Sequence, residues 1–274
     1  MKPPVMPAPR TTFCALTISG LDPGGGAGVA ADLRAFAAAG VFGCAVVALL
    51  TVQSTSGLVK SYPVRSDILV SQANEVVKRQ RVTVIKTGAL GTAGNVRALA
   101  AWLAEQRSIP VIVDPVLLPS AGRGRLLLSG AVKALRDDLL PRATLVTANV
   151  HEAEALLGRR VLGVRDAREA ARELVELGAR AAMVKGGHLA GDRAVDVLAI
   201  GGSIVELASS RRRLPPMHGG GCVLASLIAG HLAGHLAGAL DGRLLESVRW
   251  ARRRHQRALR SLRDVGGEQR VLMF

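Results

Sequence analysis

Residues 13–19 read Phe-Cys-Ala-Leu-Thr-Ile-Ser, and residues 20–28 continue as Gly-Leu-Asp-Pro-Gly-Gly-Gly-Ala-Gly. The first run predicts a buried strand, and a helix is predicted over residues 29–39, ending at Gly40. A strand, a glycine loop and a helix in this order present ligands at the carboxyl end of the strand in α/β proteins. The loop lacks the Gly-Lys-Ser/Thr ending of a P-loop, and its spacing does not match the dinucleotide fingerprint. Its distinctive residue is Asp22, a carboxylate held in the turn itself.

Beyond this unit, further apolar runs predict strands that alternate with helices. The strands are expected at residues 44–51, 82–86, 110–113, 143–147 and 181–185, and the helices at 95–106, 130–139, 151–157, 164–177 and 244–262. A hairpin is expected from residues 196–200 and 203–208, turning on Gly201 and Gly202. The alternation predicts an α/β fold with a mostly parallel sheet and helices on both faces. One domain over residues 13–264 accounts for the chain, with residues 1–12 as a tail and about ten C-terminal residues loose.

A second glycine-rich stretch, Met217-His218-Gly219-Gly220-Gly221-Cys222, precedes an apolar run that extends to Leu240. The run predicts a helix, so Cys222 is expected near a helix N-terminus behind a flexible turn. Free backbone N–H groups and the helix dipole favour an anion there, such as a phosphate, and are expected to lower the pKa of the thiol. Taken alone, the stretch is explained more simply as a turn before a buried helix with a small buried cysteine. The rest of the chain favours the anion site.

Polar residues fall at or just after the ends of the predicted strands: Asp22, Gln53, Asp114, Asn149 and Lys185. In an open parallel sheet, these ends line one crevice. Carboxylates, an amide, an ammonium group and an anion-binding helix end in one crevice suit metal-assisted phosphoryl transfer. Two of these assignments have alternatives, because Asp114 could belong to a simple turn and Lys185 could be a surface lysine.

The composition limits the partners that the protein could bind. The formal net charge is +15, from 36 Lys and Arg residues against 21 Asp and Glu, and nearly all of the excess is Arg. Such a charge suits nucleic acid or an acidic surface. Aromatic residues make up only 3% of the chain, which leaves little surface for base stacking, so no nucleic acid partner is expected. We interpret the basic residues as solvated surface that also suits anionic substrates.

The three cysteines are too far apart in the sequence for a disulfide framework or a metal site. The N-terminal residues lack the apolar segment of a signal peptide, so a reducing cytoplasm is expected. A glycine repeat at residues 230, 234 and 238 resembles the pattern of membrane helix pairs. Two histidines interrupt that repeat and Asp241 ends it, so a soluble helix packed on a sheet is the better prediction, and no membrane partner is expected.

Seven blocks of sequence, in order along the chain, are similar to those of one family. They read TISGLDPGGGAG (residues 17–28) with ADL (31–33), TVQST (51–55), KTGAL (86–90), DPV (114–116), TAN (147–149) with EAE (152–154), VKGGH (184–188) and HGGGC (218–222). With these blocks the chain resembles the hydroxymethylpyrimidine and phosphomethylpyrimidine kinases of thiamine biosynthesis, within the ribokinase-like superfamily. The resemblance implies a sheet of about eight strands, as in doubly wound folds, and a homodimer. It also implies ATP and Mg²⁺ as cofactors, and two successive phosphorylations of 4-amino-5-hydroxymethyl-2-methylpyrimidine.

The resemblance further assigns roles by position. Asp22 and Gln53 would bind the aminopyrimidine. Its ring would be lined by Gly20, Ala89 and Val116. The nucleotide phosphates would lie near Asn149, Lys185 and Gly187, and the metal near Glu152 and Asp114. An anion hole would be formed by Gly219, Gly220 and Gly221, with Cys222 where related sugar kinases have an Asp base.

The chain departs from the family pattern at several positions. Gly220 stands where Thr is usual, Ala148 where Pro is usual, and Ala89 where Met is usual, and the loop at residues 119–122 lacks a Lys often found there. A pyridoxal or pyridoxine kinase of the same superfamily is one alternative, because Ala89 widens the ring pocket. A catalytically degraded, pyrimidine-binding regulatory protein is another, because Gly220 removes a hydroxyl from the anion hole.

Four further polar residues in these blocks receive no catalytic role. His188 and His218 are interpreted as structural hydrogen-bonding residues, and Asp32 and His151 as surface or capping residues.

Overall fold

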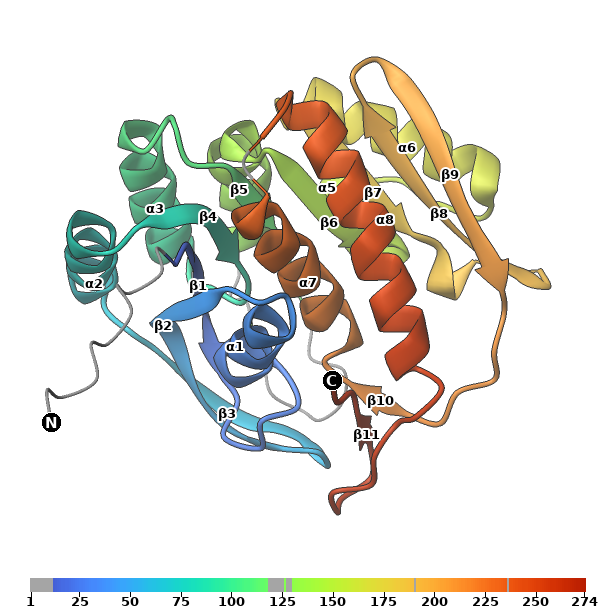
Figure 1. The fold of residues 1–274 in the computed structure, drawn as a ribbon, viewed down its shortest axis with the longest axis horizontal. Helices are drawn as coiled ribbons and strands as arrows, with labels where there is room; N and C mark the ends of the chain where they lie inside the picture. Colours follow the sequence, from blue (N-terminus) through green and yellow to red (C-terminus); the bar gives the residue numbers. More distant parts are fainter. Residues whose placement is uncertain (1–11, 118–125, 127–129, 190, 236) are drawn as a thin grey trace, which may run out of the picture.

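A nine-stranded sheet forms the centre of the protein (Figure 1). The computed structural model describes residues 12–117, 126, 130–189, 191–235 and 237–274. The expected tail, except for Thr12, and the loop at residues 119–122 lie outside the described residues. The strand order is β3-β2-β1-β4-β5-β6-β7-β8-β9, in which the neighbours from β2 to β7 pair in parallel and β3, β8 and β9 join antiparallel.

The strands of the sheet are β1 (Cys14–Leu21), β2 (Phe42–Ser54), β3 (Gly57–Pro63), β4 (Val82–Thr87), β5 (Val111–Val113), β6 (Leu145–Asn149), β7 (Ala181–Lys185), β8 (Arg193–Ile200) and β9 (Ser203–Ser210). The α-helices are α1 (Gly28–Ala38), α2 (Ser66–Arg79), α3 (Ala93–Glu105), α4 (Ala131–Ala134), α5 (Val150–Leu157), α6 (Val164–Glu176), α7 (Gly220–Gly234) and α8 (Leu240–Ala258). A π turn (Leu135–Leu139) and a 3-10 turn (Leu140–Arg142) continue α4, and a 3-10 turn (Gly186–His188) follows β7.

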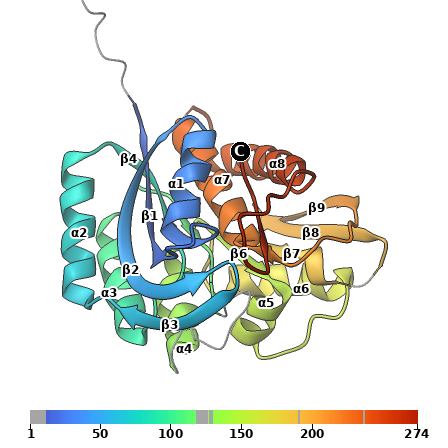
Figure 2. The ribbon, with the colours of Figure 1, turned by 90° about the horizontal axis from the view of Figure 1, so that it is seen from below.

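Helices cover both faces of the sheet, as Figure 2 shows from below. Side chains of a strand point alternately to its two faces, and in β1 the buried Leu16 and Ile18 contribute to the core shared with α2 to α6. Ala15, on the opposite face, contributes to the core shared with α1, α7 and α8. The predicted α/β class, its mostly parallel sheet and the hairpin at Gly201 and Gly202 are confirmed, with one strand more than the resemblance implied.

Two elements after β2 were not predicted from the sequence. β2 continues to Ser54 and turns into β3, an antiparallel edge strand, and α2 follows. The helix predicted over the last apolar run ends at Gly234, and within it Gly230 packs closely on α1, where a Cβ would lie 2.9 Å from the Cβ of Ala39. Among the described helices, none has the combination of length and apolar sequence that crossing a membrane requires.

The residues after α8 are held against the rest of the fold, so the expectation of a loose C-terminus was wrong. A two-residue strand, β11 (Arg270–Val271), pairs in parallel with β10 (Met217–His218) just before α7. Thr55 accepts a hydrogen bond from the Gln269 backbone N–H at 3.0 Å, and its hydroxyl donates to the Gly266 carbonyl at 2.6 Å. We call residues 263–271 the C-terminal clasp, because they join the β2–β3 turn to the start of α7.

Candidate functional site

A cavity lies at the carboxyl ends of β1, β2 and β4, beside the start of α7. It is lined by Ser19, Gly20, Asp22, Ala27, Gly28, Thr51, Gln53, Ala89, Val116, Leu126 and Cys222. The structure therefore brings together every residue assigned to the pyrimidine, and it places the thiol in the same cavity. Sequence reasoning missed Ser19, Ala27, Gly28, Thr51 and Leu126 as lining residues. Of these, Ser19 and Gly28 could have been found, because they lie inside the first glycine block and flank its loop.

Asp22 folds the glycine loop as well as lining the cavity. Its Oδ1 accepts from the Gly24 N–H at 2.8 Å, and its Oδ2 accepts from the Ala27 N–H at 2.9 Å and from His218 Nε2 at 2.8 Å. Burial alone would raise the pKa of Asp22, but the hydrogen bond from His218 and those from the loop outweigh it and hold the pKa below its usual value. Asp22 is therefore an ionised carboxylate in a fixed position.

His218 lies between the two residues that were assigned to the pyrimidine. The same Nε2 atom that donates to Asp22 lies 3.3 Å from Gln53 Nε2, which is also a donor, so this second contact is not a hydrogen bond. The His218 ring is buried and packs against Gly26, where a Cβ would lie 2.3 Å from the ring. His218 thus positions Asp22, in agreement with its interpretation as a structural residue.

The predicted anion site lies at the start of α7. Gly219 adopts φ 76°, and a Cβ on it would lie 2.0 Å from the Gly26 carbonyl oxygen, so this position requires glycine. The next three residues begin the helix, and their N–H groups have no carbonyl four residues earlier to bond. A Cβ on Gly221 would lie 3.2 Å from Lys185 Nζ, so the ammonium group lies against this first turn. Helix N–H groups and an ammonium group together attract phosphate.

Cys222 lies in this first turn, as predicted, but its thiol does not have the predicted lowered pKa. Burial raises the pKa of Cys222 to about 12, and the nearby carboxylates of Asp114 and Asp32 add to the effect of burial while Lys86 opposes it. Desolvation therefore outweighs the attraction of the Lys86 ammonium group and the hydrogen bond with the Gly28 backbone, both of which lower the pKa of the thiol. The thiol is protonated at neutral pH in this environment, so it is not a ready general base.

Gly220 marks the main departure from the family pattern in this turn. A Cβ at Gly220 would lie 2.4 Å from the terminal methyl carbon of Met217. The Met217 side chain thus covers the position at which the kinases that this chain resembles usually have a threonine side chain. The backbone donors of the turn do not depend on that side chain.

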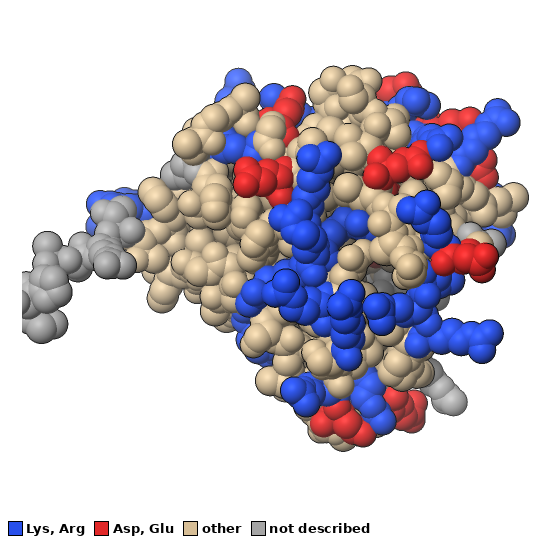
Figure 3. Space-filling model, turned by 45° about the vertical axis from the view of Figure 1, so that its right-hand side comes forward, with Lys and Arg blue, Asp and Glu red and all other residues tan. Residues whose placement is uncertain are grey.

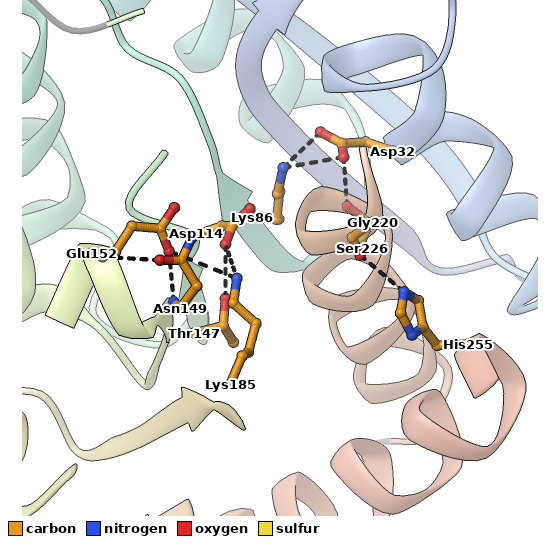
Figure 4. A network of polar contacts seen from close by, with 10 residues as sticks. All are labelled: Asp32, Lys86, Asp114, Thr147, Asn149, Glu152, Lys185, Gly220, Ser226 and His255. Carbon is orange, nitrogen blue, oxygen red and sulfur yellow. Dashed lines mark hydrogen bonds and ion pairs between the residues drawn. The ribbon is translucent and has the colours of Figure 1, made fainter. Parts of the chain in front are cut away.

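Figure 4 shows a second group of polar residues, at the ends of β5, β6 and β7. Lys185 Nζ lies 3.0 Å from Asp114 Oδ1 and 3.8 Å from Glu152 Oε2. Thr147 donates to the same Asp114 oxygen at 3.1 Å. Burial works against both charges, but the attraction between them prevails, so the pKa of Lys185 is raised and that of Asp114 is lowered. Asp114 and Lys185 therefore form a buried ion pair, and neither is a surface or turn residue.

Asn149 and Glu152 hold the start of α5 by a reciprocal capping interaction. Asn149 Oδ1 accepts from the Glu152 N–H at 2.9 Å, and Glu152 Oε2 accepts from the Asn149 N–H at 2.7 Å. Burial raises the pKa of Glu152 to about 7; Lys185 opposes this shift and Asp114 adds to it. The Asn149 oxygen is thus committed to the helix cap, whereas the Glu152 carboxyl faces Lys185.

Gly187 lies in the 3-10 turn after Lys185, where its carbonyl accepts from Arg211 Nη1 at 2.7 Å. The sterically constrained glycine is its neighbour Gly186, because a Cβ there would lie 1.9 Å from the Val195 carbonyl oxygen. The turn positions the end of β7, and with it Lys185.

Asp32 is fully buried, so its interpretation as a surface or capping residue was wrong. Lys86 Nζ lies 2.9 Å from Asp32 Oδ2, and both side chains are fully buried. The hydroxyls of Thr17 and Ser226 each donate to Asp32 at 2.6 Å. This network joins β1, β4, α1 and α7, and Figure 4 shows its members Asp32, Lys86 and Ser226.

Arginines concentrate on the face of the molecule that carries α8, where Figure 3 shows a band of basic side chains. Arg249, Arg253 and Arg257 are exposed on this helix. His255, on the same helix, lies with its Nε2 3.0 Å from the Gly220 carbonyl oxygen. The helix that carries these arginines thus contacts the first turn of α7 through His255.

The sequence model of phosphomethylpyrimidine kinase matches residues 22–271, which include the cavity, the Lys185 group and the first turn of α7. The chain belongs to this family. It is 41% identical to the thiamine biosynthesis bifunctional protein of Geobacter sulfurreducens over 81% of its own length, but it spans only 45% of that longer protein. It is 38% identical to a hydroxymethylpyrimidine/phosphomethylpyrimidine kinase of Rhizobium meliloti, over 80% of this chain and 82% of that one.

Solved structures agree with this family assignment. The phosphomethylpyrimidine kinase of Clostridium difficile superimposes with a TM-score of 0.74, 29% identity and coverage of 88% of this chain and 98% of that one. The ADP complex of a pyridoxal kinase of Bacillus subtilis gives a TM-score of 0.85 at 27% identity, covering 96% of this chain and 97% of that one. The ribokinase-like fold of this family member is thereby confirmed.

The polar group around Lys185 fits a metal ion that is shared with phosphates. Among the described residues, no three His, Cys, Asp or Glu side chains could enclose a metal ion by themselves. Mg²⁺ in kinases takes one or two carboxylates and completes its shell with water and phosphate oxygens. Asp114 and Glu152 supply two carboxyl groups close to the anion site, so the donor set of this family member suits Mg²⁺ bound together with a nucleotide.

Proposed function

We propose that this protein is an ATP-dependent kinase that phosphorylates 4-amino-5-hydroxymethyl-2-methylpyrimidine, and then its monophosphate, in thiamine biosynthesis. One observation carries the proposal. The cavity lined by Asp22 and Gln53 is also lined by Cys222, which lies in the first turn of α7. A pyrimidine held by its edge would therefore present its hydroxymethyl group to the anion site. The names and identities of the relatives support the same reaction.

ATP would place its phosphates between Lys185 and the first turn of α7. The ammonium group and the helix N–H groups would stabilise the charge that develops on the transferred phosphoryl group. Mg²⁺, held by Asp114 and Glu152 together with the phosphates, would neutralise the triphosphate. Phosphoryl transfer needs little proton removal from the attacking alcohol before the transition state. A protonated Cys222 is compatible with this chemistry, because positioning then carries the reaction.

An assay of ADP release tests the reaction. The purified protein is given ATP and Mg²⁺ with hydroxymethylpyrimidine, its monophosphate, pyridoxal or no acceptor. We expect release with the first two, none after chelation of the metal, and recovery when Mg²⁺ is returned. Lys185→Met should lower kcat by about 10²-fold or more through loss of transition-state charge stabilisation. The exposed Lys60 provides the matched control Lys60→Met, which should behave as wild type.

Pyridoxal is the alternative acceptor of the phosphoryl group. Ala89 lines the cavity at a position where the pyrimidine kinases that this chain resembles usually have methionine, so the cavity is wider there. A kcat/KM for pyridoxal above that for hydroxymethylpyrimidine would reassign the substrate. Binding of the pyrimidine without release of ADP under any condition would favour the regulatory protein instead.

We also propose a cytoplasmic homodimer. Leu50 and Val52 on β2 and Val59 and Tyr62 on β3 are large apolar side chains exposed to solvent at one edge of the sheet. A second copy of the chain would cover this surface. Sedimentation should give a dimer for the wild type, and Val59→Glu should shift it toward monomer. A wild-type monomer at assay concentration would contradict this part of the proposal.

A further inference from the structure

Ser19 has a polar group that the fold leaves unused. The side chain is 1% exposed, and among the described residues nothing hydrogen-bonds its hydroxyl. Buried hydroxyls are almost always paired, because an unpaired one loses its bonds to water without replacement. The same hydroxyl belongs to a residue that lines the cavity. A group from a bound ligand is therefore the natural partner.

The surroundings of the Ser19 hydroxyl are polar. Thr17 lies two residues earlier on the same face of β1, and its hydroxyl reaches Asp32. Gly88 leaves room beside both groups, since a Cβ there would lie 2.2 Å from Ser19 Oγ and 3.0 Å from Lys86 Nζ. Ser19 is thus next to the ammonium group of Lys86, which pairs with Asp32. Ser19 and Cys222 line the same cavity.

We propose that Ser19 is a specificity-determining residue whose hydroxyl hydrogen-bonds the hydroxymethyl oxygen of the substrate. This inference rests on the proposed function, because it assumes a pyrimidine alcohol in the cavity. A serine hydroxyl can accept from an alcohol before transfer and donate to the ester oxygen after it, so one side chain serves both phosphorylation steps. Asp22 and Gln53 would recognise the ring edge, and Ser19 the group that reacts.

Binding measurements without ATP separate this role from a structural one. Calorimetry compares hydroxymethylpyrimidine with an analogue that carries a methyl group in place of the hydroxymethyl group. We expect Ser19→Ala to raise the Kd for hydroxymethylpyrimidine by about 5- to 50-fold, the range for loss of one buried hydrogen bond. The Kd for the methyl analogue should not change. The thermal midpoint of the free protein should stay the same or rise, because an unpaired buried hydroxyl is removed.

Thr87 provides a matched control. Its hydroxyl is also buried without a partner among the described residues, but Thr87 is not one of the residues that line the cavity. Thr87→Val should leave both Kd values unchanged. If Ser19→Ala does not fold, Ser19→Cys keeps nearly the same volume with a much weaker hydrogen-bonding group and should give the same selective loss.

Three results would overturn the inference. Ser19→Ala could bind hydroxymethylpyrimidine as tightly as wild type, which would leave the proposed function intact and remove Ser19 from recognition. It could weaken both ligands equally, which would make Ser19 a shape-determining residue only. Failure of the wild type to bind hydroxymethylpyrimidine at all would refute the proposed function, and this inference with it.

Discussion

Cys222 is the residue whose chemistry differs most from the expectation. A thiol with a pKa of about 12 is protonated at pH 7 and reacts slowly with alkylating reagents. Removal of a true general base would lower turnover by about 10²–10⁴-fold. We expect Cys222→Ser to keep kcat within about tenfold of wild type, because it conserves size and the backbone donors. Single-turnover rates and the alkylation rate at pH 7 would check both statements. A 10³-fold loss in Cys222→Ser would restore the thiolate mechanism.

The Lys86–Asp32 pair should be needed for folding rather than for binding. Removal of one partner leaves the other charge buried and uncompensated, which costs about 3–5 kcal/mol of unfolding free energy. Lys86→Met and Asp32→Asn should each approach this value in urea denaturation. The double variant should lose clearly less than the sum of the two, because it leaves no unpaired charge. Additive losses would mean that the pair does not interact as its 2.9 Å contact indicates.

The burial of Asp32 could have been read from the sequence. It lies three residues after Val29 and four before Phe36, which is the spacing of one helix face, and both neighbours are buried apolar residues. Asp22 and Gln53 were predictable for a different reason, because strand ends in a parallel sheet must meet at one edge. The assignment of Gly20, Ala89 and Val116 came from the family resemblance alone. The pKa of Cys222 was not predictable, because it depends first on the burial of the thiol and then on charged groups that only the folded chain brings near it.

Helix α7 depends on one glycine at its start, and this glycine is Gly219. Gly219 has a positive φ, whereas Gly221 is helical. Gly219→Ala should lower the unfolding free energy by more than about 1 kcal/mol, from strain in the left-handed region and from the clash with Gly26. Gly219→Ala should also raise the KM for ATP.

Gly221→Ala is the control, because Gly221 is helical and faces the flexible end of the Lys185 side chain. This variant should fold with nearly wild-type stability. Equal destabilisation by Gly219→Ala and Gly221→Ala would contradict the assignment of the constrained position to Gly219.

Helices α7 and α8 should separate more easily in acid. Burial lowers the pKa of His255 to about 4, below its ordinary 6.5. Between these pH values the unfolded chain holds a proton that the folded chain does not, so the stabilisation is complete above about pH 6.5 and is lost as the pH falls toward 4. We expect wild type to lose about 1–3 kcal/mol more unfolding free energy than His255→Gln between pH 7 and 4.5. His151→Gln, at an exposed imidazole, should follow wild type.

The elements that sequence reasoning missed differ in their local signals. In α2, Leu69 and Ala73 are buried and Val76 and Val77 pack against the same core, a helical spacing that could have been read from the sequence, although the N-cap residue, Arg65, makes no side-chain capping bond. β11 has two residues and pairs with a strand far away in the sequence, which no local pattern can reveal. Long elements with buried faces, such as α6 and β7, were placed to within one residue at each end.

At the scale of the whole molecule, the C-terminal clasp ties the two walls of the site together. Val271 pairs with His218 and packs toward Gly26, where a Cβ would lie 3.2 Å from it. Val271→Ala should raise the Kd for the pyrimidine several-fold, on the order of 1 kcal/mol, by loosening His218 behind Asp22. Met273→Ala, at an exposed position nearby, is the control and should bind as wild type. Calorimetry would measure both, and unchanged binding in Val271→Ala would show that the clasp supports only stability.

The C-terminal clasp also determines at what stage of protein synthesis the binding site can form. The glycine loop leaves the ribosome among the first segments, whereas Val271 follows roughly 250 residues later, at about 5–20 residues per second. A nascent chain that already has its full central sheet still lacks the segment that holds His218 against the loop. Such a chain would bind the pyrimidine weakly. A ribosome that stalls late in the message would therefore carry a chain whose sheet is folded but whose binding site is incomplete.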